Sequence, residues 1–221
     1  MSIGGSTSSR HDPMPRLRLV LATANRDKAA EIIDIVRAAA GGSVELVACP
    51  EGTAEVDETG DTLEENARLK ARALVELTGL PAVADDTGLE VDALGGEPGV
   101  RSSRYAGIAG RYDENVTKLL AELEAADATT AHERRARFRT VTVACFPDGH
   151  EVFADGLVEG TIVFERQGVG GFGYDPVFVP AGQERTFAEM QPQEKHAISQ
   201  RGRAFRALVD ALLEDIDSRE A

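Results

Sequence analysis

The sequence predicts a mixed α/β protein, and three observations support this fold class. Over residues 16–84, short apolar runs typical of buried strands alternate with patterns typical of amphipathic helices. Further along, residues 138–146 and 151–157 read as two strands joined by a Pro-Asp-Gly turn, which is typical of an antiparallel hairpin. With 221 residues, 42% of them hydrophobic, the chain can bury a core as one domain or as two lobes that share one sheet.

Composition and charge exclude several classes of protein. The formal net charge of −14 argues against binding polymeric nucleic acid through a basic face, whereas a small anionic substrate is compatible with cations gathered in a cleft. No apolar run reaches the ~18 residues of a transmembrane helix, so we expect no membrane partner. Residues 1–15 are polar and lack the apolar core of a signal peptide. We therefore expect a cytoplasmic protein with a disordered tail at residues 1–15 and one folded domain at residues 16–221.

The first strand is predicted at residues 16–22, and it leads through a polar turn into a helix that ends at Gly41-Gly42. The first N–H groups of such a helix are free and the helix dipole is positive at this end, so the turn is suited to bind an anion. Thr23 and Asn25 would add hydrogen-bond donors, and Lys28 would add a positive charge. Alternatively, Asn25 only caps the helix and Lys28 is solvated.

A second strand is predicted at residues 43–47, before an acid-rich loop. The next helix is predicted to begin at Thr62, because Glu65 completes a capping-box pattern, and to end at a Gly-Leu-Pro sequence. Asp57 and Glu58 lie just ahead of this helix. Acidic residues there are usually surface groups stabilised by the helix dipole, but they could also bind a hard cation with a further carboxylate.

The stretch after this helix carries two adjacent acids. Its apolar run, residues 82–84, is expected to end as a strand at Thr87-Gly88, which would place Asp85 and Asp86 at the rim of a sheet. Side chains alternate along a strand, so the two acids should point to opposite faces, and only one can easily serve a given site. Asp86 could complete the cation site described above. The alternative is a solvated Asp-Asp turn. Three glycines and a proline within residues 95–99 favour a shaped loop.

A third helix is predicted at residues 113–125 from its apolar spacing. Residues 128–137 are predicted to form a linker, whose arginines should make a solvated edge rather than a nucleic-acid patch. The hairpin strands follow this linker, and a further strand is predicted at residues 161–165.

Residues 168–176 match the spacing G-x-G-x-x-G of dinucleotide-binding loops. That fingerprint must open a helix, whereas here a strand pattern follows at residues 177–179, so the dinucleotide interpretation is rejected. A flexible backbone that carries Phe172 and Tyr174 could instead form a surface on which a flat ring stacks. A glycine-rich hairpin with two core aromatics is the alternative.

The last helix is predicted at residues 194–216, with Lys195, Arg201 and Arg203 near its start. Cations are unfavourable at a helix N-terminus, so this cluster is an anomaly that an anionic ligand would resolve.

Seven ordered segments resemble the inosine triphosphate pyrophosphatase family, and together they extend from Leu17 to about Leu213. The segments are LATANRDK (21–28), ETGDTLEENARLKA (58–71), VADDTGLEVDALGGEPGV (83–100), SRYAG (103–107), GGFGYDPVF (170–178), TFAEM (186–190) and EKHAISQRGRA (194–204).

The resemblance implies an elongated mixed β-sheet flanked by helices, with two lobes and a nucleotide cleft between them. It also implies hydrolysis of ITP, dITP and XTP to the monophosphate and pyrophosphate, with Mg²⁺ as cofactor, in a homodimer. Asp86 would be the proton acceptor and a metal ligand. The implied substrate-binding residues are Thr23, Asn25, Lys28, Thr87, Phe172, Gly173, Tyr174, Asp175, Lys195 and Arg201.

Two positions depart from the family pattern. Asp57 stands where the family usually has a glutamate metal ligand, so a water bridge or Glu58 would have to compensate. Gln200 stands where the family commonly has histidine in Ser-His-Arg. Gln200 can still form hydrogen bonds to the base, but it cannot titrate near neutral pH. His196, one helical turn earlier, either compensates in part or is solvated.

Two other functions stay open at this point. A related pyrophosphatase of the same architecture could act on modified pyrimidine triphosphates, although Phe172 and the arginines of the last helix favour purines. A nucleotide sensor without catalysis is the second alternative, although candidates for every acid and lysine of the mechanism are present.

Overall fold

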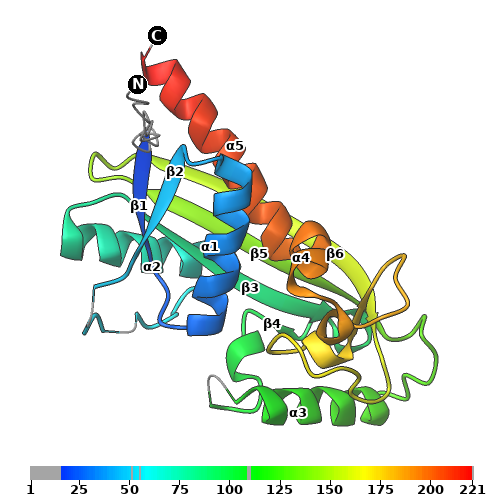
Figure 1. Cartoon of the computed structure of the whole chain (residues 1–221). Coiled ribbons are helices and arrows are strands. Elements are labelled where there is room, and N and C mark those ends of the chain that lie inside the picture. The colour runs from blue at the N-terminus through cyan, green and yellow to red at the C-terminus, as the bar shows by residue number, and fades with distance from the viewer. Residues whose placement is uncertain (1–15, 51, 55, 109–110, 221) are drawn as a thin grey trace, which may run out of the picture.

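A computed structural model describes residues 16–50, 52–54, 56–108 and 111–220 of the chain (Figure 1). The tail expected at residues 1–15 lies outside the described residues. A seven-stranded mixed sheet forms the centre, with the order β2-β1-β3-β5-β6-β7 and with β4 added beside β3. The strands are β1 (Leu17–Leu21), β2 (Val44–Ala48), β3 (Ala82–Val91), β4 (Pro98–Gly99), β5 (Arg135–Cys145), β6 (Glu151–Ile162) and β7 (Phe178–Pro180).

Pairing directions make the sheet mixed. β1 runs parallel to β2 and β3, whereas β3, β5, β6 and β7 form an antiparallel series. The strands β3, β5 and β6 are long, at 10, 11 and 12 residues, and they cross the molecule as a diagonal, elongated spine (Figure 1). The predicted fold class is therefore confirmed.

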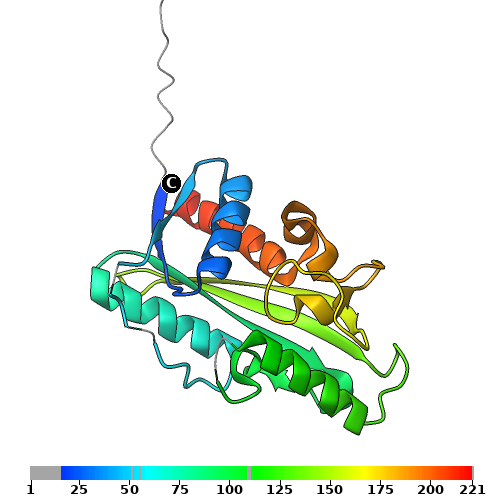
Figure 2. The same cartoon turned by 60° about the horizontal axis from the view of Figure 1, so that its bottom comes forward.

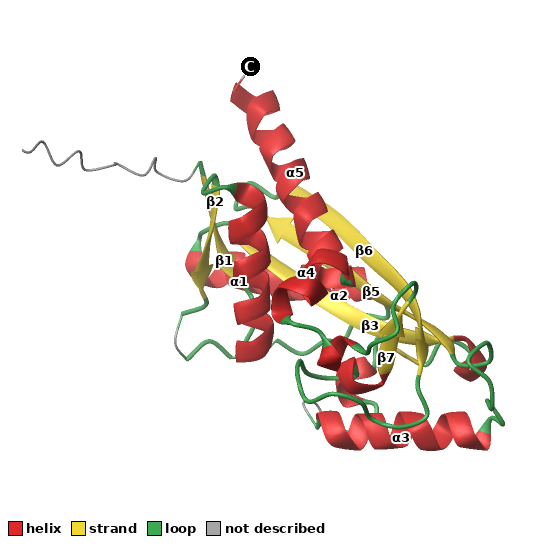
Figure 3. Cartoon of the chain, turned by 45° about the vertical axis from the view of Figure 1, so that its right-hand side comes forward, coloured by secondary structure: helices red, strands yellow, loops and turns green. Residues whose placement is uncertain are grey.

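Helices cover both faces of this spine. α1 (Arg26–Ala40) and α5 (Gln200–Glu220) pack on one face, and α2 (Leu63–Thr78) packs on the other (Figure 2). α3 (Tyr112–Ala125) lies at the far end of the long strands, away from β1 and β2 (Figure 3). The short helix α4 (Pro192–Ile198) precedes α5. None of the helices in the described part of the chain combines the length and apolar character that crossing a membrane requires.

Two apolar clusters flank a polar belt on the face of α1 and α5. Val83 and Phe205 belong to the first cluster, which also contains α1 residues, and Leu89 and Phe138 belong to the second, which includes α3. Between them, Asp85 and its β5 partner Thr142 are both buried, at 1% and 0% exposure. Burying a charge costs free energy unless the charge is paired. The buried carboxylate of Asp85 therefore needs cationic partners within this belt.

The structure corrects two strand predictions. The run at residues 82–84 does not end at Thr87-Gly88, because β3 continues to Val91, so Asp85 and Asp86 lie within a central strand and not at a rim. Gly88 serves close packing and not a turn, since a Cβ there would lie 2.8 Å from the Gly99 carbonyl oxygen. The prediction of a separate strand at residues 161–165 was also wrong. β6 extends to Ile162, and the next strand, which pairs with β6, is β7.

Two further predictions were wrong. The last helix is interrupted at Ser199, whose extended backbone (φ −65°, ψ 156°) separates α4 from α5. The expected linker at residues 128–137 overlaps β5, and its arginines do not form one solvated edge. Arg134 is 4% exposed and donates to the carbonyl oxygens of Ala128 and Val163, so it ties two loops together.

Candidate active site

Asp85 is the buried anchor of one face of β3. Its carboxylate lies 3.0 Å from Lys28 Nζ and 3.3 Å from Arg201 Nε, so it joins α1 to α5. Burial alone would raise the pKa of Asp85, but the charges of Lys28 and Arg201 outweigh burial and lower it to about 2. Asp85 is therefore ionised at neutral pH and held by two cations.

Asp86 faces the opposite layer, as the alternation along the strand predicts. Its carboxylate lies 3.1 Å from Lys70 Nζ and accepts a hydrogen bond of 3.3 Å from Asn66 Nδ2, both on α2. Burial raises the pKa of Asp86, and nearby Glu58 raises it further, against the opposing charge of Lys70. The pKa values of the two neighbouring acids are thus moved in opposite directions, which is the pattern expected when one carboxylate is structural and the other exchanges protons.

Glu58 belongs to the same cluster as Asp86. Lys70 Nζ lies 2.7 Å from Glu58 Oε1 and so bridges the two carboxylates. Arg104, from the SRYAG segment, donates to both the side chain and the backbone carbonyl of Glu58 and holds its loop in place. Asp57 is exposed, and within the described part of the chain its carboxylate makes no hydrogen bond or ion pair. The structure therefore brings Glu58, and not Asp57, to Asp86.

Glu58 and Asp86 offer the carboxylate oxygens that a hard cation prefers, but they are only two ligands. In the described ranges, no three His, Cys, Asp or Glu side chains converge in a way that could hold a metal ion. Magnesium is usually bound by one or two carboxylates together with substrate phosphate oxygens and water. Two carboxylates that share one ammonium group fit that pattern, with the substrate supplying the remaining ligands.

The turn between β1 and α1 contains a helix cap at Asn25 and a positive charge at Lys28. Asn25 caps the helix, since its Oδ1 accepts from the Lys28 backbone N–H at 3.1 Å, and its own N–H donates to Thr23 Oγ1 at 3.2 Å. Lys28 is not solvated: its side chain is 15% exposed and its ammonium group also donates to the Asp85 carbonyl oxygen. Burial lowers the pKa of Lys28, against the charge of Asp85.

In the glycine-rich segment, only one aromatic ring is free to stack on a ligand. Tyr174 is 4% exposed and its hydroxyl donates to the Ser102 carbonyl oxygen at 2.9 Å, so its ring belongs to the core. Asp175 accepts from the Phe172 backbone N–H at 2.9 Å. Phe172 is half-buried, so of the two rings it alone remains a candidate for stacking. The neighbouring Gly173 has a left-handed φ of 65°, which completes the turn.

The cations of the last two helices have partners inside the protein. Lys195 lies 2.7 Å from Asp175, and Arg201 lies 2.6 Å from Glu31 of α1. Since Ser199 ends α4, Lys195 sits in the last turn of that helix, where a cation is favourable. Buried carboxylates therefore neutralise two of the three cations, and the third, Arg203, is exposed and donates to the Leu157 carbonyl oxygen at 2.8 Å.

Arg201 lies close to two other predicted site residues, Thr87 and Phe172. Arg201 Nη2 donates to Thr87 Oγ1 at 3.3 Å, and its guanidinium carbon lies 5.4 Å from the Phe172 ring centroid. Gln200 is 3% exposed, and among the described residues its Oε1 has no hydrogen-bond partner. His196 lies 3.8 Å from Glu31, and burial lowers its pKa. It is therefore a neutral neighbour of the cluster and not a solvated side chain.

Sequence reasoning missed four residues of this region. They are Glu31, Asn66, Lys70 and Tyr112, whose hydroxyl oxygen accepts from Asn25 Nδ2. A signal existed for two of them: Asn66 and Lys70 are polar residues spaced i, i+4 on the inner side of an amphipathic helix, beside the buried Ala67 and Ala71. Polar groups on such a face are buried and need partners, which points to a site.

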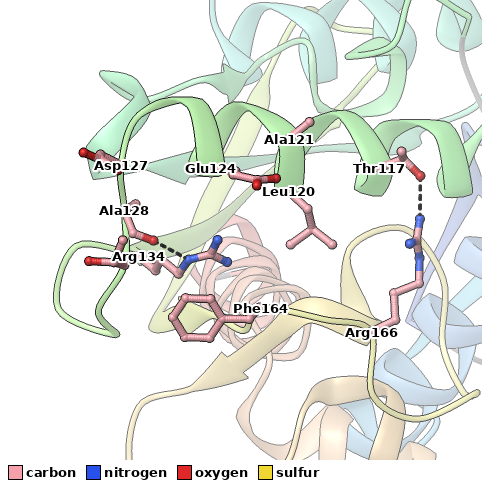
Figure 4. Close-up of a pocket in the computed structure, with 10 residues that line it drawn as sticks. Thr117, Leu120, Ala121, Glu124, Asp127, Ala128, Arg134, Phe164 and Arg166 are labelled. Atoms are coloured by element: carbon pink, nitrogen blue, oxygen red, sulfur yellow. Dashed lines mark hydrogen bonds between the residues drawn. The ribbon is translucent and has the colours of Figure 1, made fainter.

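A hollow of about 630 Å³ lies elsewhere, between α3 and the segment after β6 (Figure 4). Figure 4 shows the guanidinium of Arg134 beside the Phe164 ring, and Arg166 reaching Thr117, at 2.8 Å, from the other end. None of the predicted site residues lines this hollow, so we do not include it in the candidate site.

Comparison with known proteins gives consistent results. A family model described as the Ham1 family matches residues 19–211. A dITP/XTP pyrophosphatase of Streptomyces coelicolor is 48% identical over 200 residues, which cover 89% of this chain and 98% of that protein. The dITP/XTP pyrophosphatase of Nitratidesulfovibrio vulgaris is 47% identical over 203 residues, with 89% and 96% covered. The solved structure of a HAM1 protein from Coxiella burnetii has a TM-score of 0.79 and 41% identity, and the match covers 90% of this chain and 99% of that one.

Proposed function

The chain belongs to the Ham1 family, and on that premise we propose that it hydrolyses ITP, dITP and XTP to the nucleoside monophosphate and pyrophosphate. It is a nucleoside-triphosphate pyrophosphatase, and its substrates are non-standard purine nucleotides. Removing them from the nucleotide pool prevents their incorporation into DNA and RNA.

One observation supports this reaction more than any other: two adjacent acids are held in opposite electrostatic states. Asp85 is fixed as an anion between Lys28 and Arg201, whereas the pKa of Asp86 is raised in a cluster that also contains Glu58 and Lys70. A general base needs a pKa nearer to the working pH than that of an ordinary aspartate. The raised pKa moves Asp86 towards this requirement, and its carboxylate lies 3.1 Å from Lys70 Nζ.

We propose that Asp86 and Glu58 hold Mg²⁺, with Asp57 contributing at most through a bound water. When bound, the ion would neutralise phosphate oxygens and lower the pKa of a coordinated water. Lys70 now compensates the charge of both carboxylates, so it is placed to interact with the phosphate oxygens that arrive with the ion.

The protein groups then act on the substrate in defined ways. Asp86 takes the proton of the water that attacks the α-phosphorus, and the bond to the leaving pyrophosphate breaks without a covalent enzyme intermediate. Thr23, Asn25 and Lys28 bind the triphosphate at the N-terminus of α1. Lys28 and Lys195 stabilise the negative charge that develops on pyrophosphate, because positively charged groups placed in advance act without reorganisation.

Base recognition falls to the face of β3 that carries Asp85 and Thr87, opposite to the face of Asp86. The base would stack on Phe172 near Arg201 and Thr87, with the backbone of residues 172–175 reading its edge. The Oε1 of Gln200, which has no partner among the described residues, can accept an N–H of the base. Adenine presents an amino group and a bare nitrogen where hypoxanthine has a 6-oxo group and an N1–H, so ATP would leave polar groups unpaired.

We also propose a cytoplasmic homodimer in which residues 16–221 form one pyrophosphatase domain of two lobes. The two apolar clusters, one with α1 and α5 and one with α3, support the two lobes.

The test is pyrophosphate release by the purified protein with Mg²⁺, comparing ITP, dITP and XTP with ATP, GTP and the pyrimidine triphosphates. We expect rapid turnover of the first three only. Preferred turnover of modified pyrimidine triphosphates would favour the related pyrimidine enzyme. Tight binding of ITP without turnover, with Asp86→Asn behaving like the wild type, would favour a sensor.

A further inference from the structure

Tyr112, the first residue of α3, joins two parts of the candidate site that are far apart in sequence. Its hydroxyl oxygen accepts a hydrogen bond of 2.6 Å from Asn25 Nδ2, across 87 residues. Its ring centroid lies 5.8 Å from that of Phe172, with the planes tilted by 39°. Tyr112 is half-buried, so one side of it remains open to solvent. The residue therefore touches both the proposed phosphate-binding turn and the proposed base-binding ring.

The hydrogen bonds of Asn25 determine the state of the tyrosine hydroxyl. The Oδ1 of Asn25 is used to cap α1, so Nδ2 is its remaining polar group, and Nδ2 donates to Tyr112. Because the phenol oxygen accepts this bond, its own proton is free to be donated. Within the described ranges, no acceptor takes that proton. A phenol O–H at a turn that binds phosphate would donate to a phosphate oxygen, and hydrogen bonds to charged groups are the strong ones.

The ring of Tyr112 has a separate role. Phe172 is approached by two cations, Lys195 Nζ at 5.0 Å and Arg201 Cζ at 5.4 Å from its centroid. Tyr112 adds an aromatic wall at the same ring, and tilted aromatic neighbours stabilise each other beyond their buried area. The wall comes from α3, in the second apolar cluster, whereas Asn25 belongs to the end of α1. Tyr112 thus links the start of α3 to the β1–α1 turn and to Phe172.

We infer that Tyr112 is a further substrate-binding residue, whose hydroxyl donates to the triphosphate at the β1–α1 turn and whose ring supports the stacking of the base on Phe172. This inference rests on the proposed function. It predicts separable effects, because the hydroxyl and the ring act on different parts of the substrate.

The experiment uses Tyr112→Phe, which removes only the hydroxyl, and Tyr112→Ala, which also removes the ring. Steady-state kinetics with ITP and competitive inhibition by tripolyphosphate and by inosine are measured for each, with thermal unfolding as a check on folding. For Tyr112→Phe we expect KM for ITP and the inhibition constant of tripolyphosphate to rise by about tenfold, with inosine unchanged. For Tyr112→Ala both inhibition constants should rise. Tyr105→Phe, a buried tyrosine outside the site, is the control and should change neither constant.

Two results would overturn the inference. Unchanged binding constants in Tyr112→Phe together with a lower Tm would show that the hydroxyl only stabilises the fold. Tighter binding of tripolyphosphate by Tyr112→Phe would show that Tyr112 competes with the substrate for Asn25. Failure of the proposed function is a distinct outcome, because wild-type protein would then release no pyrophosphate from ITP, while tripolyphosphate binding measured directly by isothermal titration calorimetry would still report on Tyr112.

Discussion

Asp85→Asn and Asp86→Asn differ in position by one residue, but only Asp85→Asn should destabilise the protein at pH 7. The difference between the ordinary aspartate pKa of 3.8 and the value of about 2 for Asp85 corresponds to about 2.5 kcal/mol of stabilisation, at ~1.36 kcal/mol per pH unit. The side chain is 1% exposed, so solvent screening removes little of this energy. Asp85→Asn also leaves Lys28 without its carboxylate. We therefore expect a loss of about 3 kcal/mol at pH 7, or a fall in Tm of roughly 6–12 °C.

The pH dependence gives the sign of each effect. A lowered pKa means that Asp85 stabilises the fold above its unfolded-state pKa, and that this contribution is lost as pH falls through the folded value of about 2. The raised pKa of Asp86 means that its ionised form is less stable in the folded protein than in the unfolded chain. Asp86→Asn should therefore leave stability at pH 7 unchanged or increase it, and the difference should vanish below the ordinary aspartate pKa. Its turnover of ITP should fall on the order of 10³-fold.

Urea unfolding at several pH values measures the stability of each variant, and pyrophosphate release measures its turnover of ITP. The reasoning is refuted if Asp86→Asn is the more destabilised variant, or if the two variants lose the same stability at pH 7. Retention of near wild-type turnover by Asp86→Asn would contradict the assignment of the base, whatever its stability.

Three other predictions concern single contacts. In the metal-free protein, the Asp86 carboxyl should titrate above an ordinary aspartate, because burial raises its pKa; an NMR titration that places it at or below the ordinary value would argue against this. Asn66→Asp cannot donate to Asp86 and adds a like charge, so the same titration should show the pKa of Asp86 raised further, whereas an unchanged titration would mean that Asn66 only fills space. Gly171→Ala should destabilise the protein by ~2 kcal/mol or more in thermal unfolding, since its φ is 68° and a Cβ would collide with the Asp175 carboxylate; an unchanged Tm would contradict this packing.

The helices and most strands could be predicted because their signals are local. The capping box of Thr62 and Glu65 forms as expected, Gly79 ends α2 in a left-handed conformation, and Asn25 caps α1. Alternation along β3 correctly placed Asp85 and Asp86 on opposite faces. The fold class was predicted from such local patterns, and the family from the seven ordered segments that resemble it.

What could not be predicted depends on contacts between distant residues. Glu31 resembles any acidic residue of an amphipathic helix until Arg201, 170 residues later, is brought to it. Gly88 suggested the end of a strand, because its contact with Gly99 cannot be seen from the neighbouring sequence. The interruption at Ser199 is marked only by Gly202, where a Cβ would collide with the His196 carbonyl oxygen, a contact that the neighbouring sequence does not reveal. It places Lys195 at the end of a helix and not at the start of one.

With Asp86 as the proposed proton acceptor, the register of β3 becomes a requirement for catalysis. Side chains alternate with a period of two, so moving this strand by one residue would exchange Asp85 and Asp86 between the two helical layers. The anchoring carboxylate would then face α2, and the proton acceptor would lie between Lys28 and Arg201. Ten residue pairs with β5 and the close approach of Gly88 to Gly99 oppose such a slip. Insertions or deletions of a single residue within β3 should therefore abolish turnover even where the protein still folds.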